Sequence, residues 1–225
     1  ATTDDHPIRA GNDTGRPFGL QGRPPRGRTR SRLARPREMR YQGPMSITLY
    51  YNPQSRAQLT RWLLEEIGVP YTLAPVGYED GSMRTPQFLA ISPLGKIPAI
   101  VDDGQSVSEQ IAIAIYLADK YKTPNDLAPA ASDPQRGEYL RWIAFNANVE
   151  AAMMQKFAGF EMNPRSAGWG SVQQVIDVLR ARLEQAQPWL LGNRFSAADV
   201  VLGGGLNYAV TFGAFPALPE FTAYL

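Results

Sequence analysis

The 225-residue sequence is 44% hydrophobic and 20% charged, with a formal net charge of +2, which is typical of an ordinary globular protein. It contains no cysteine, which excludes disulfides, thiolate metal sites and a cysteine nucleophile, so any thiol chemistry must use a ligand's sulfur. With His6 as the single histidine, we expect no metal site. Apolar stretches such as residues 111–118 are too short to cross a bilayer, and we expect a cytoplasmic protein with no membrane partner.

Residues 1–44 differ in composition from the rest of the chain. They contain ten of the 23 basic residues, all arginine, together with six prolines and six glycines. Such a segment cannot bury enough apolar surface to offset its ordering entropy, so we expect a disordered extension. An arginine-rich tail can bind nucleic acid, but this one lacks interleaved aromatic residues, which argues against a nucleic-acid partner.

The first part of the remaining chain predicts a βαβ unit. Ile47–Tyr51 is rich in β-branched and aromatic residues and predicts a buried strand. A helix with one apolar face is predicted from Ser55 to Ile67, ending at Gly68 as its C-cap. A second strand is predicted from Tyr71 to Val76. Two strands joined by one helix form a parallel pair.

A short helix, a hairpin and a longer helix are predicted next. The short helix covers Pro86–Ile91, and a strand led by Pro98 follows it. Asp103–Gly104 lies between apolar runs, which is a strong hairpin signal. The return strand runs through Val107, and the helix covers Glu109–Tyr121. The fold class is therefore α/β in this part, with the order βαβ, α, ββα.

Everything after a polar, proline-containing linker is predicted to be helical. One helix covers Pro134–Phe160 and another covers Ser171–Trp189, with apolar residues at helical spacing. A third begins at Ser196, because Asp199 three residues later completes a capping-box pattern. The predicted domains are an extension (1–44), an α/β domain (45–121), a linker (122–132) and an all-α domain (133–225) that lacks its last helix.

The segment around Pro98 predicts a binding site for a small acidic peptide. If the Ile97–Pro98 bond is cis, the backbone of Ile97 turns outward and remains unpaired, so an extended peptide can pair with it. Ser108–Gln110 begins a helix, where free N–H groups suit a carboxylate. One short segment therefore offers an unpaired backbone edge to a peptide and free N–H groups to its carboxylate.

Four runs of residues, in this order and spacing, resemble a bacterial glutathione transferase over residues 46–225. They are Leu49–Ala57, Pro93–Ile100, Ser108–Ile113 with Tyr116–Leu117, and Phe195–Asp199. The resemblance implies a thioredoxin-like N-terminal domain followed by an all-helical C-terminal domain. It also implies a homodimer, and glutathione as co-substrate without any other cofactor.

The resemblance also implies roles for five residues. The backbone of Ile97, exposed by Pro98, pairs with the cysteinyl part of glutathione. Glu109 aligns with the acidic residue that meets the γ-glutamyl amine. Gln110 departs from the usual serine but retains an amide and a backbone N–H for the γ-glutamyl carboxylate. Lys96 pairs with the glycyl carboxylate.

The group that stabilises the ligand's thiolate is less sharply indicated. Ser55, at the predicted N-terminus of the first helix, is the first candidate, although N-capping alone also explains a serine there. Asn52 and Tyr51 are the second and third candidates, and Asn52 also counts with Ser55 among the expected glutathione contacts. A free thiol titrates near 8.5, and lowering its pKa by two units requires about 2.7 kcal/mol.

The expected function is transfer of the glutathione thiolate to a small hydrophobic electrophile. Core packing is the favoured interpretation for Tyr139, Phe157, Phe160 and Trp169, and a pocket wall for that second substrate is the alternative. A non-catalytic glutathione-binding or partner-docking module on the same fold is the alternative function.

Overall fold

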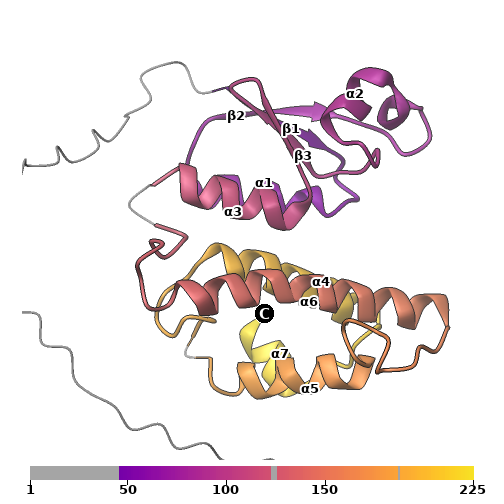
Figure 1. The fold of residues 1–225 in the computed structure, drawn as a ribbon, viewed down its shortest axis with the longest axis vertical. Coiled ribbons are helices and arrows are strands. Elements are labelled where there is room, and N and C mark those ends of the chain that lie inside the picture. The colour runs from indigo at the N-terminus through magenta and orange to yellow at the C-terminus, as the bar shows by residue number, and fades with distance from the viewer. Residues whose placement is uncertain (1–45, 123–125, 187) are drawn as a thin grey trace, which may run out of the picture. The chain divides into compact units, whose positions relative to one another are not determined.

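The computed structural model describes residues 46–122, 126–186 and 188–225. The predictions made for residues 1–44, and for the centre of the linker, lie outside these ranges. The first described part contains a four-stranded mixed sheet with the strand order β2-β1-β3-β4 (Figure 1). Its strands are β1 (Ile47–Tyr51), β2 (Tyr71–Pro75), β3 (Ala99–Asp102) and β4 (Gln105–Ser108).

The sheet follows the predicted connectivity. β1 and β2 are parallel and are joined by helix α1 (Ala57–Ile67), whereas β3 pairs antiparallel with β1 and β4. Asp103 and Gly104 both have positive φ, +50° and +83°, as a two-residue hairpin turn requires. The α/β fold class and the hairpin are therefore confirmed.

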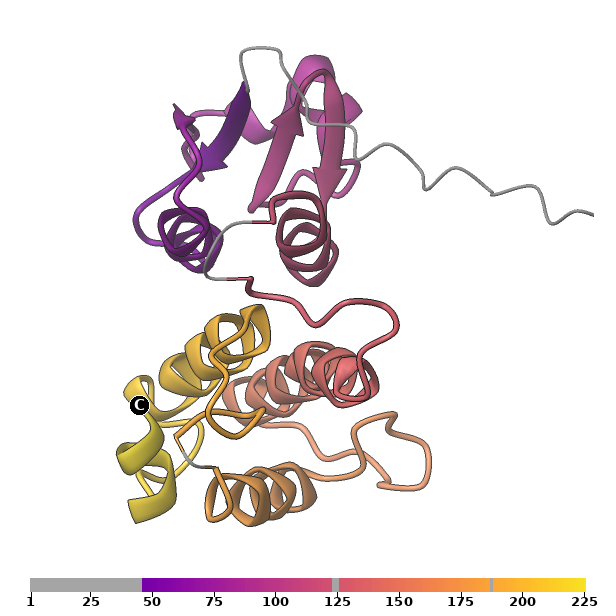
Figure 2. The ribbon, with the colours of Figure 1, turned by 90° about the vertical axis from the view of Figure 1, so that its left-hand side faces the viewer.

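Helices cover both faces of the sheet. α1 and α3 (Gln110–Lys120) lie side by side on one face, between the sheet and the later helices (Figure 2). The short α2 (Pro86–Ile91) packs on the opposite face, where the rings of Tyr50 and Phe88 meet edge to face at 5.3 Å. Alternation along β1 explains this arrangement, because successive side chains point to opposite faces.

The start of α1 differs from the prediction. The helix begins at Ala57 rather than Ser55, and its C-cap is Gly68 as predicted, with φ of +74°. The Ser55 hydroxyl donates to the Asn52 carbonyl at 2.7 Å and accepts from the Ala57 N–H at 3.1 Å. Ser55 therefore closes a turn that precedes the helix.

The second part is helical, as predicted. It contains α4 (Arg136–Ala158), α5 (Val172–Leu183), a π-helical turn η2 (Asp199–Gly203), α6 (Gly204–Thr211) and α7 (Pro219–Tyr224). α5 ends six residues before the predicted Trp189, and isolated bridges from Trp189 to Gly192 and from Leu191 to Arg194 follow it. The sequence did not indicate the π-helical turn. No helix in the described ranges is long and apolar enough to span a bilayer.

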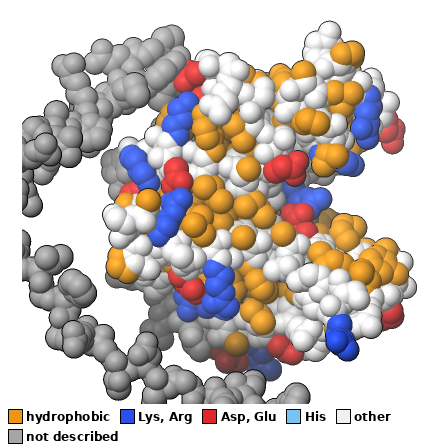
Figure 3. All heavy atoms as spheres, viewed as in Figure 1, with side chains coloured by type: hydrophobic (Ala, Val, Ile, Leu, Met, Phe, Trp, Pro, Cys, Tyr) orange, Lys and Arg blue, Asp and Glu red, His pale blue; other side chains and the backbone are white. Residues whose placement is uncertain are grey.

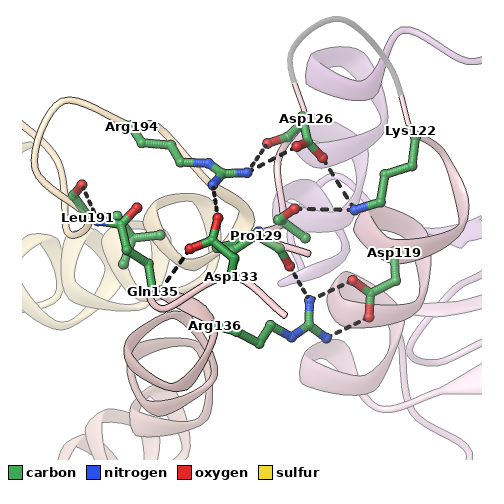
Figure 4. A network of polar contacts seen from close by, with 10 residues as sticks. Asp119, Lys122, Asp126, Pro129, Asp133, Gln135, Arg136, Leu191 and Arg194 are labelled. Carbon is green, nitrogen blue, oxygen red and sulfur yellow. Dashed lines mark hydrogen bonds and ion pairs between the residues drawn. The ribbon is translucent and has the colours of Figure 1, made fainter. Parts of the chain in front are cut away.

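Two arginines bind the connection between the sheet and the helices (Figure 4). Arg136 pairs with both oxygens of Asp119 on α3, at 2.7 Å each, and also donates to the Pro129 carbonyl at 2.9 Å. Arg194 pairs with Asp126 at 3.1 Å and with Asp133 at 3.0 Å. The described ends of the connection are therefore anchored to α3 and to the segment before α6.

Candidate functional site

The loop before β3 presents the backbone of Ile97. The Ile97–Pro98 peptide bond is cis. The buried Ser92 hydroxyl donates to the Lys96 carbonyl at 2.8 Å and accepts from the Lys96 N–H at 3.3 Å, so the chain is fixed just before Ile97. Within the described residues, neither backbone polar group of Ile97 has a backbone hydrogen-bond partner. This open edge can accept an extended peptide.

Gly95 lets an arginine lie against the same loop. Its φ is +61°, and a Cβ there would come within 2.7 Å of both the Met83 carbonyl oxygen and the Arg84 guanidinium. Arg84 donates to the Leu94 carbonyl at 3.3 Å. The position therefore requires glycine both for its backbone conformation and for the close approach of Arg84.

The start of α3 contains a strained residue and an unpaired amide. Glu109 precedes the helix with φ of 70° and ψ of 115°, a conformation that side-chain-bearing residues rarely adopt. Gln110 is the first helical residue, and both polar atoms of its amide are buried without a partner in the described part of the chain. Buried polar groups are normally paired, so an unpaired amide beside a strained residue is a functional-site signal.

These groups meet in one cleft of about 240 Å³. It brings together five predicted glutathione-contact residues with four others. The predicted ones are Lys96, Ile97, Pro98, Glu109 and Gln110, and the others are Arg56, Ser92, Leu94 and Glu150. In Figure 3 a hollow opens on the right-hand side, and acidic and basic side chains lie at it.

A second cleft of about 230 Å³ adjoins the first, since Arg56, Lys96 and Ile97 line both. Tyr78 and Arg84 are among its other lining residues. Among the described residues, neither Lys96 nor Arg84 has an ion-pair partner. The second cleft therefore favours an anionic group.

Arg56 and Glu150 are site residues that the sequence did not reveal. They form an ion pair, although 94 positions separate them along the chain. Glu150 also accepts from the Asn146 amide at 3.2 Å, and Asn146 is only 1% exposed. A Cβ on Gly205 of α6 would lie 1.9 Å from the Asn146 amide oxygen. The ion pair is thus supported by close packing of α4 against α6.

The three thiol-stabilising candidates lie beside the clefts rather than among their lining residues. Ser55 is 5% exposed, with its hydroxyl bonded within the turn as described. Asn52 donates to the Val76 carbonyl and accepts from the Gln54 N–H, both at 2.9 Å. The Tyr51 hydroxyl donates to the Gln58 side chain at 3.0 Å. The donor of each side chain therefore already has a partner, in the loop for Ser55, after β2 for Asn52 and on α1 for Tyr51.

An apolar surface lies at the C-terminal end of α4, beyond Glu150. Met154, Phe157 and Phe160 are between 44% and 48% exposed. Hydrophobic side chains gather at the lower rim of the hollow in Figure 3, on the side where α4 ends in Figure 1. The two phenylalanines are therefore exposed here rather than packed in the core.

Groups of three or more metal-ligating side chains do not occur in the described ranges. The two clefts offer a ligand cations, carboxylates and one open backbone edge.

Comparison with known proteins identifies the family. Residues 45–119 match the model of the glutathione S-transferase N-terminal domain. The chain is 32% identical to the disulfide-bond oxidoreductase YfcG of Escherichia coli, over 72% of this chain and 79% of that protein. It is 27% identical to glutathione S-transferase theta-3 of Mus musculus, over 80% of each. A solved glutathione transferase family member from Pseudomonas fluorescens, with two glutathione bound, superposes with a TM-score of 0.67 at 28% identity, covering 81% of this chain and 88% of that one. The chain therefore belongs to the glutathione transferase family.

Proposed function

We propose that the chain binds reduced glutathione across the two clefts and transfers its thiolate to a small hydrophobic electrophile. The observation that carries this proposal is the meeting of an open Ile97 backbone, an unpaired Gln110 amide and the Glu109 carboxylate in one cleft. These groups complement, in turn, the central peptide unit, the γ-glutamyl carboxylate and the γ-glutamyl amine of glutathione.

The second cleft takes the other end of the tripeptide. Lys96 and Arg84 line it as cations without an ion-pair partner in the described residues, and a glycyl carboxylate supplies the missing anion. Ile97 belongs to both clefts, so a ligand that pairs with its backbone extends into each of them. One extended tripeptide thereby engages Glu109, Lys96 and Arg84 together with the open backbone of Ile97.

The thiolate is stabilised by positive charge at the shared edge of the clefts. Arg56 lines both clefts beside Ile97, and a nearby cation lowers the pKa of a thiol by favouring its charged form. Ser55 remains the proposed hydroxyl donor, and it must exchange its bond to the Asn52 carbonyl for one to sulfur. Asn52 and Tyr51 are the remaining proposed donors, and each would likewise have to give up a present bond.

The electrophile binds on the apolar surface of α4. Phe157 and Phe160 are exposed there, and an apolar electrophile that covers them gains the free energy of removing both surfaces from water. The protein's contribution to catalysis is then thiolate stabilisation and the positioning of two substrates. We further propose that the protein is a cytoplasmic homodimer.

Thiol–disulfide exchange is a second candidate function, favoured by the 32% identity to a disulfide-bond oxidoreductase. Because the chain has no cysteine, every sulfur in such a reaction belongs to a ligand. One glutathione thiolate would attack a disulfide and release one thiol, and a second glutathione would then release the other thiol and leave as glutathione disulfide. Reduction of a small dialkyl disulfide, with glutathione disulfide measured as the product, tests this reaction.

Calorimetry with reduced glutathione and conjugation of an activated aryl halide test the main proposal. We expect saturable binding in the wild-type protein. Arg56→Gln and Ser55→Ala should each lower turnover, and the larger loss identifies the main thiolate stabiliser. Gln87→Ala, on the exposed side of α2, is the matched control and should bind and turn over normally. Wild-type protein that does not bind glutathione would refute the proposal.

A further inference from the structure

The loop between β1 and α1 brings Arg56 to both clefts. Most hydrogen bonds of this loop join it to other residues of the part that contains the sheet. Asn52 and Ser55 supply them through the contacts described above. Two carbonyl groups of the loop, those of Gln54 and Ser55, additionally accept hydrogen bonds from tyrosines that lie outside it. These two contacts join the loop backbone to the segment that follows β2 and to α6.

The two tyrosines come from different parts of the molecule. The Tyr78 hydroxyl, from the segment after β2, donates to the Gln54 carbonyl at 3.4 Å. The Tyr208 hydroxyl, from α6, donates to the Ser55 carbonyl at 3.2 Å across a separation of 153 residues. The Ser55 carbonyl also accepts the Gln58 N–H at 3.2 Å, so Tyr208 adds to the first turn of α1 without replacing one of its bonds.

The environment of Tyr208 suits a fixed donor. Its ring stacks on that of Phe212 with centroids 5.7 Å apart and an angle of 28° between the planes. Burial raises the pKa of the Tyr208 hydroxyl, and the nearby Tyr78 raises it further, while Arg56 lowers it. The hydroxyl therefore keeps its proton at neutral pH and can donate it to the Ser55 carbonyl.

Arg56 is therefore located by two contacts with the helical part. The Arg56 guanidinium pairs with Glu150 of α4, and the carbonyl of the preceding residue, Ser55, accepts a hydrogen bond from the Tyr208 hydroxyl. The ion pair acts on the long side chain of Arg56, which can keep the contact with Glu150 when the loop moves. The Tyr208 bond acts on the backbone, and it adds to the bonds that the Ser55 and Arg56 carbonyls accept from the first turn of α1.

From this arrangement we infer that Tyr208 is a positioning residue for thiolate stabilisation, acting through the Ser55 carbonyl on the placement of Arg56. This inference rests on the proposed function. It assigns α6 a part in the chemistry of a cleft that α6 does not line. Without the hydroxyl, the guanidinium is held less closely at the sulfur, and the bound thiol ionises at a higher pH.

Tyr208→Phe tests the inference with the intact protein and reduced glutathione. Ultraviolet absorbance of the thiolate, followed against pH, gives the pKa of the bound thiol. We expect this pKa to rise. At pH values below the pKa, kcat/KM should fall about twofold to tenfold, which is the range that one neutral hydrogen bond supplies. The KM for glutathione should change less than kcat, because Tyr208 does not line either cleft.

Two further variants separate positioning from general stability. Tyr139→Phe is the matched control, because it removes a buried tyrosine hydroxyl that has no partner within the described residues, and it should leave the thiol pKa unchanged. In an Arg56→Gln background, Tyr208→Phe should have no further effect on the thiol pKa if it acts through Arg56. Phe212→Ala, at a ring that is 63% exposed, should raise the thiol pKa by a smaller amount even if Tyr208→Phe fails to fold.

The outcomes distinguish the inference from the proposed function. If the wild-type protein binds glutathione and Tyr208→Phe and Phe212→Ala both leave the thiol pKa unchanged, the inference alone is wrong. An equal shift with and without Arg56 would also overturn it, because Tyr208 would then act by another route. Absence of glutathione binding by the wild-type protein would overturn the proposed function and the inference together.

Discussion

Asp199 and Gln110 each begin a helical segment, but their side chains have opposite environments. The Asp199 carboxylate accepts four hydrogen bonds, from the Leu190 N–H at 2.8 Å, the Ser196 N–H at 2.9 Å, the Ser196 hydroxyl at 3.0 Å and the Tyr224 hydroxyl at 2.9 Å. Both polar atoms of the Gln110 amide are buried with no partner in the part of the chain that the structure describes.

The difference indicates a structural role for the Asp199 carboxylate and a ligand-binding role for the Gln110 amide. A buried group that is fully paired within the protein stabilises the fold, whereas an unpaired one costs free energy until something binds it. The comparison therefore predicts that changes at Asp199 affect folding, and that changes around Gln110 affect binding with little effect on folding.

The largest expected effect is the loss of stability in Asp199→Ala. This change leaves the donors of Leu190, Ser196 and Tyr224 without their acceptor, and we expect the free energy of unfolding to fall by about 3–5 kcal/mol. Urea unfolding followed by circular dichroism measures it. Asp177→Ala, at an exposed position of α5, is the control and should change stability by less than about 0.5 kcal/mol. A loss below about 1 kcal/mol at Asp199 would contradict the structural role.

Gln110→Ala should have the reverse pattern. Removing an amide that has no partner costs the folded state little, so the unfolding midpoint should stay close to that of the wild-type protein. Glutathione affinity should fall about tenfold, equivalent to about 1.4 kcal/mol, because the γ-glutamyl carboxylate loses a donor. Gln173→Ala, in the first turn of α5, is the matched control for calorimetry. Unchanged affinity in Gln110→Ala would remove this residue from the proposed site.

The smallest expected effect is a gain in stability from Glu109→Gly. Glycine adopts a φ of 70° without steric cost, and we expect the free energy of unfolding to rise by about 0.5–1 kcal/mol. Glutathione binding should weaken, because the carboxylate that meets the γ-glutamyl amine is lost. Glu109→Gln separates the two effects, since it removes the charge and keeps the strained backbone. A less stable Glu109→Gly protein would show that Glu109 is not strained.

Local patterns predicted most of the secondary structure. β1 and α2 have the predicted bounds, Gly68 is the predicted C-cap, and Asp103–Gly104 is the predicted hairpin turn. These features depend on residues close together in the chain, such as β-branched runs, a C-cap glycine and a two-residue turn. The start of α1 was misplaced because a serine that closes a turn and one that caps a helix look alike in sequence.

The site was predictable only where its residues are neighbours in the chain. Lys96, Ile97 and Pro98 form one segment and Glu109 and Gln110 another, and the hairpin between these segments brings them to one cleft. Arg56 with Glu150, and Ser55 with Tyr208, are 94 and 153 residues apart, and no spacing pattern relates them. The positive φ of Glu109 was also invisible, because glutamate has no preference for that conformation.

The amino-acid sequence alone determined the α/β and all-α parts, because hydrophobic periodicity, turns and caps act over a few residues. Its four motif runs carried the resemblance to the family, and that resemblance implied the segments that face glutathione in the proposed site. The tertiary structure decided which polar groups are paired and which remain open. Pairing depends on which groups tertiary packing brings within hydrogen-bond distance, such as the Tyr224 hydroxyl of α7 and the Asp199 carboxylate, and a linear sequence does not record that distance. The capping-box pattern indicated the bond from Ser196 to Asp199, but the bonds from Leu190 and Tyr224 and the open Gln110 amide are visible only in the folded protein.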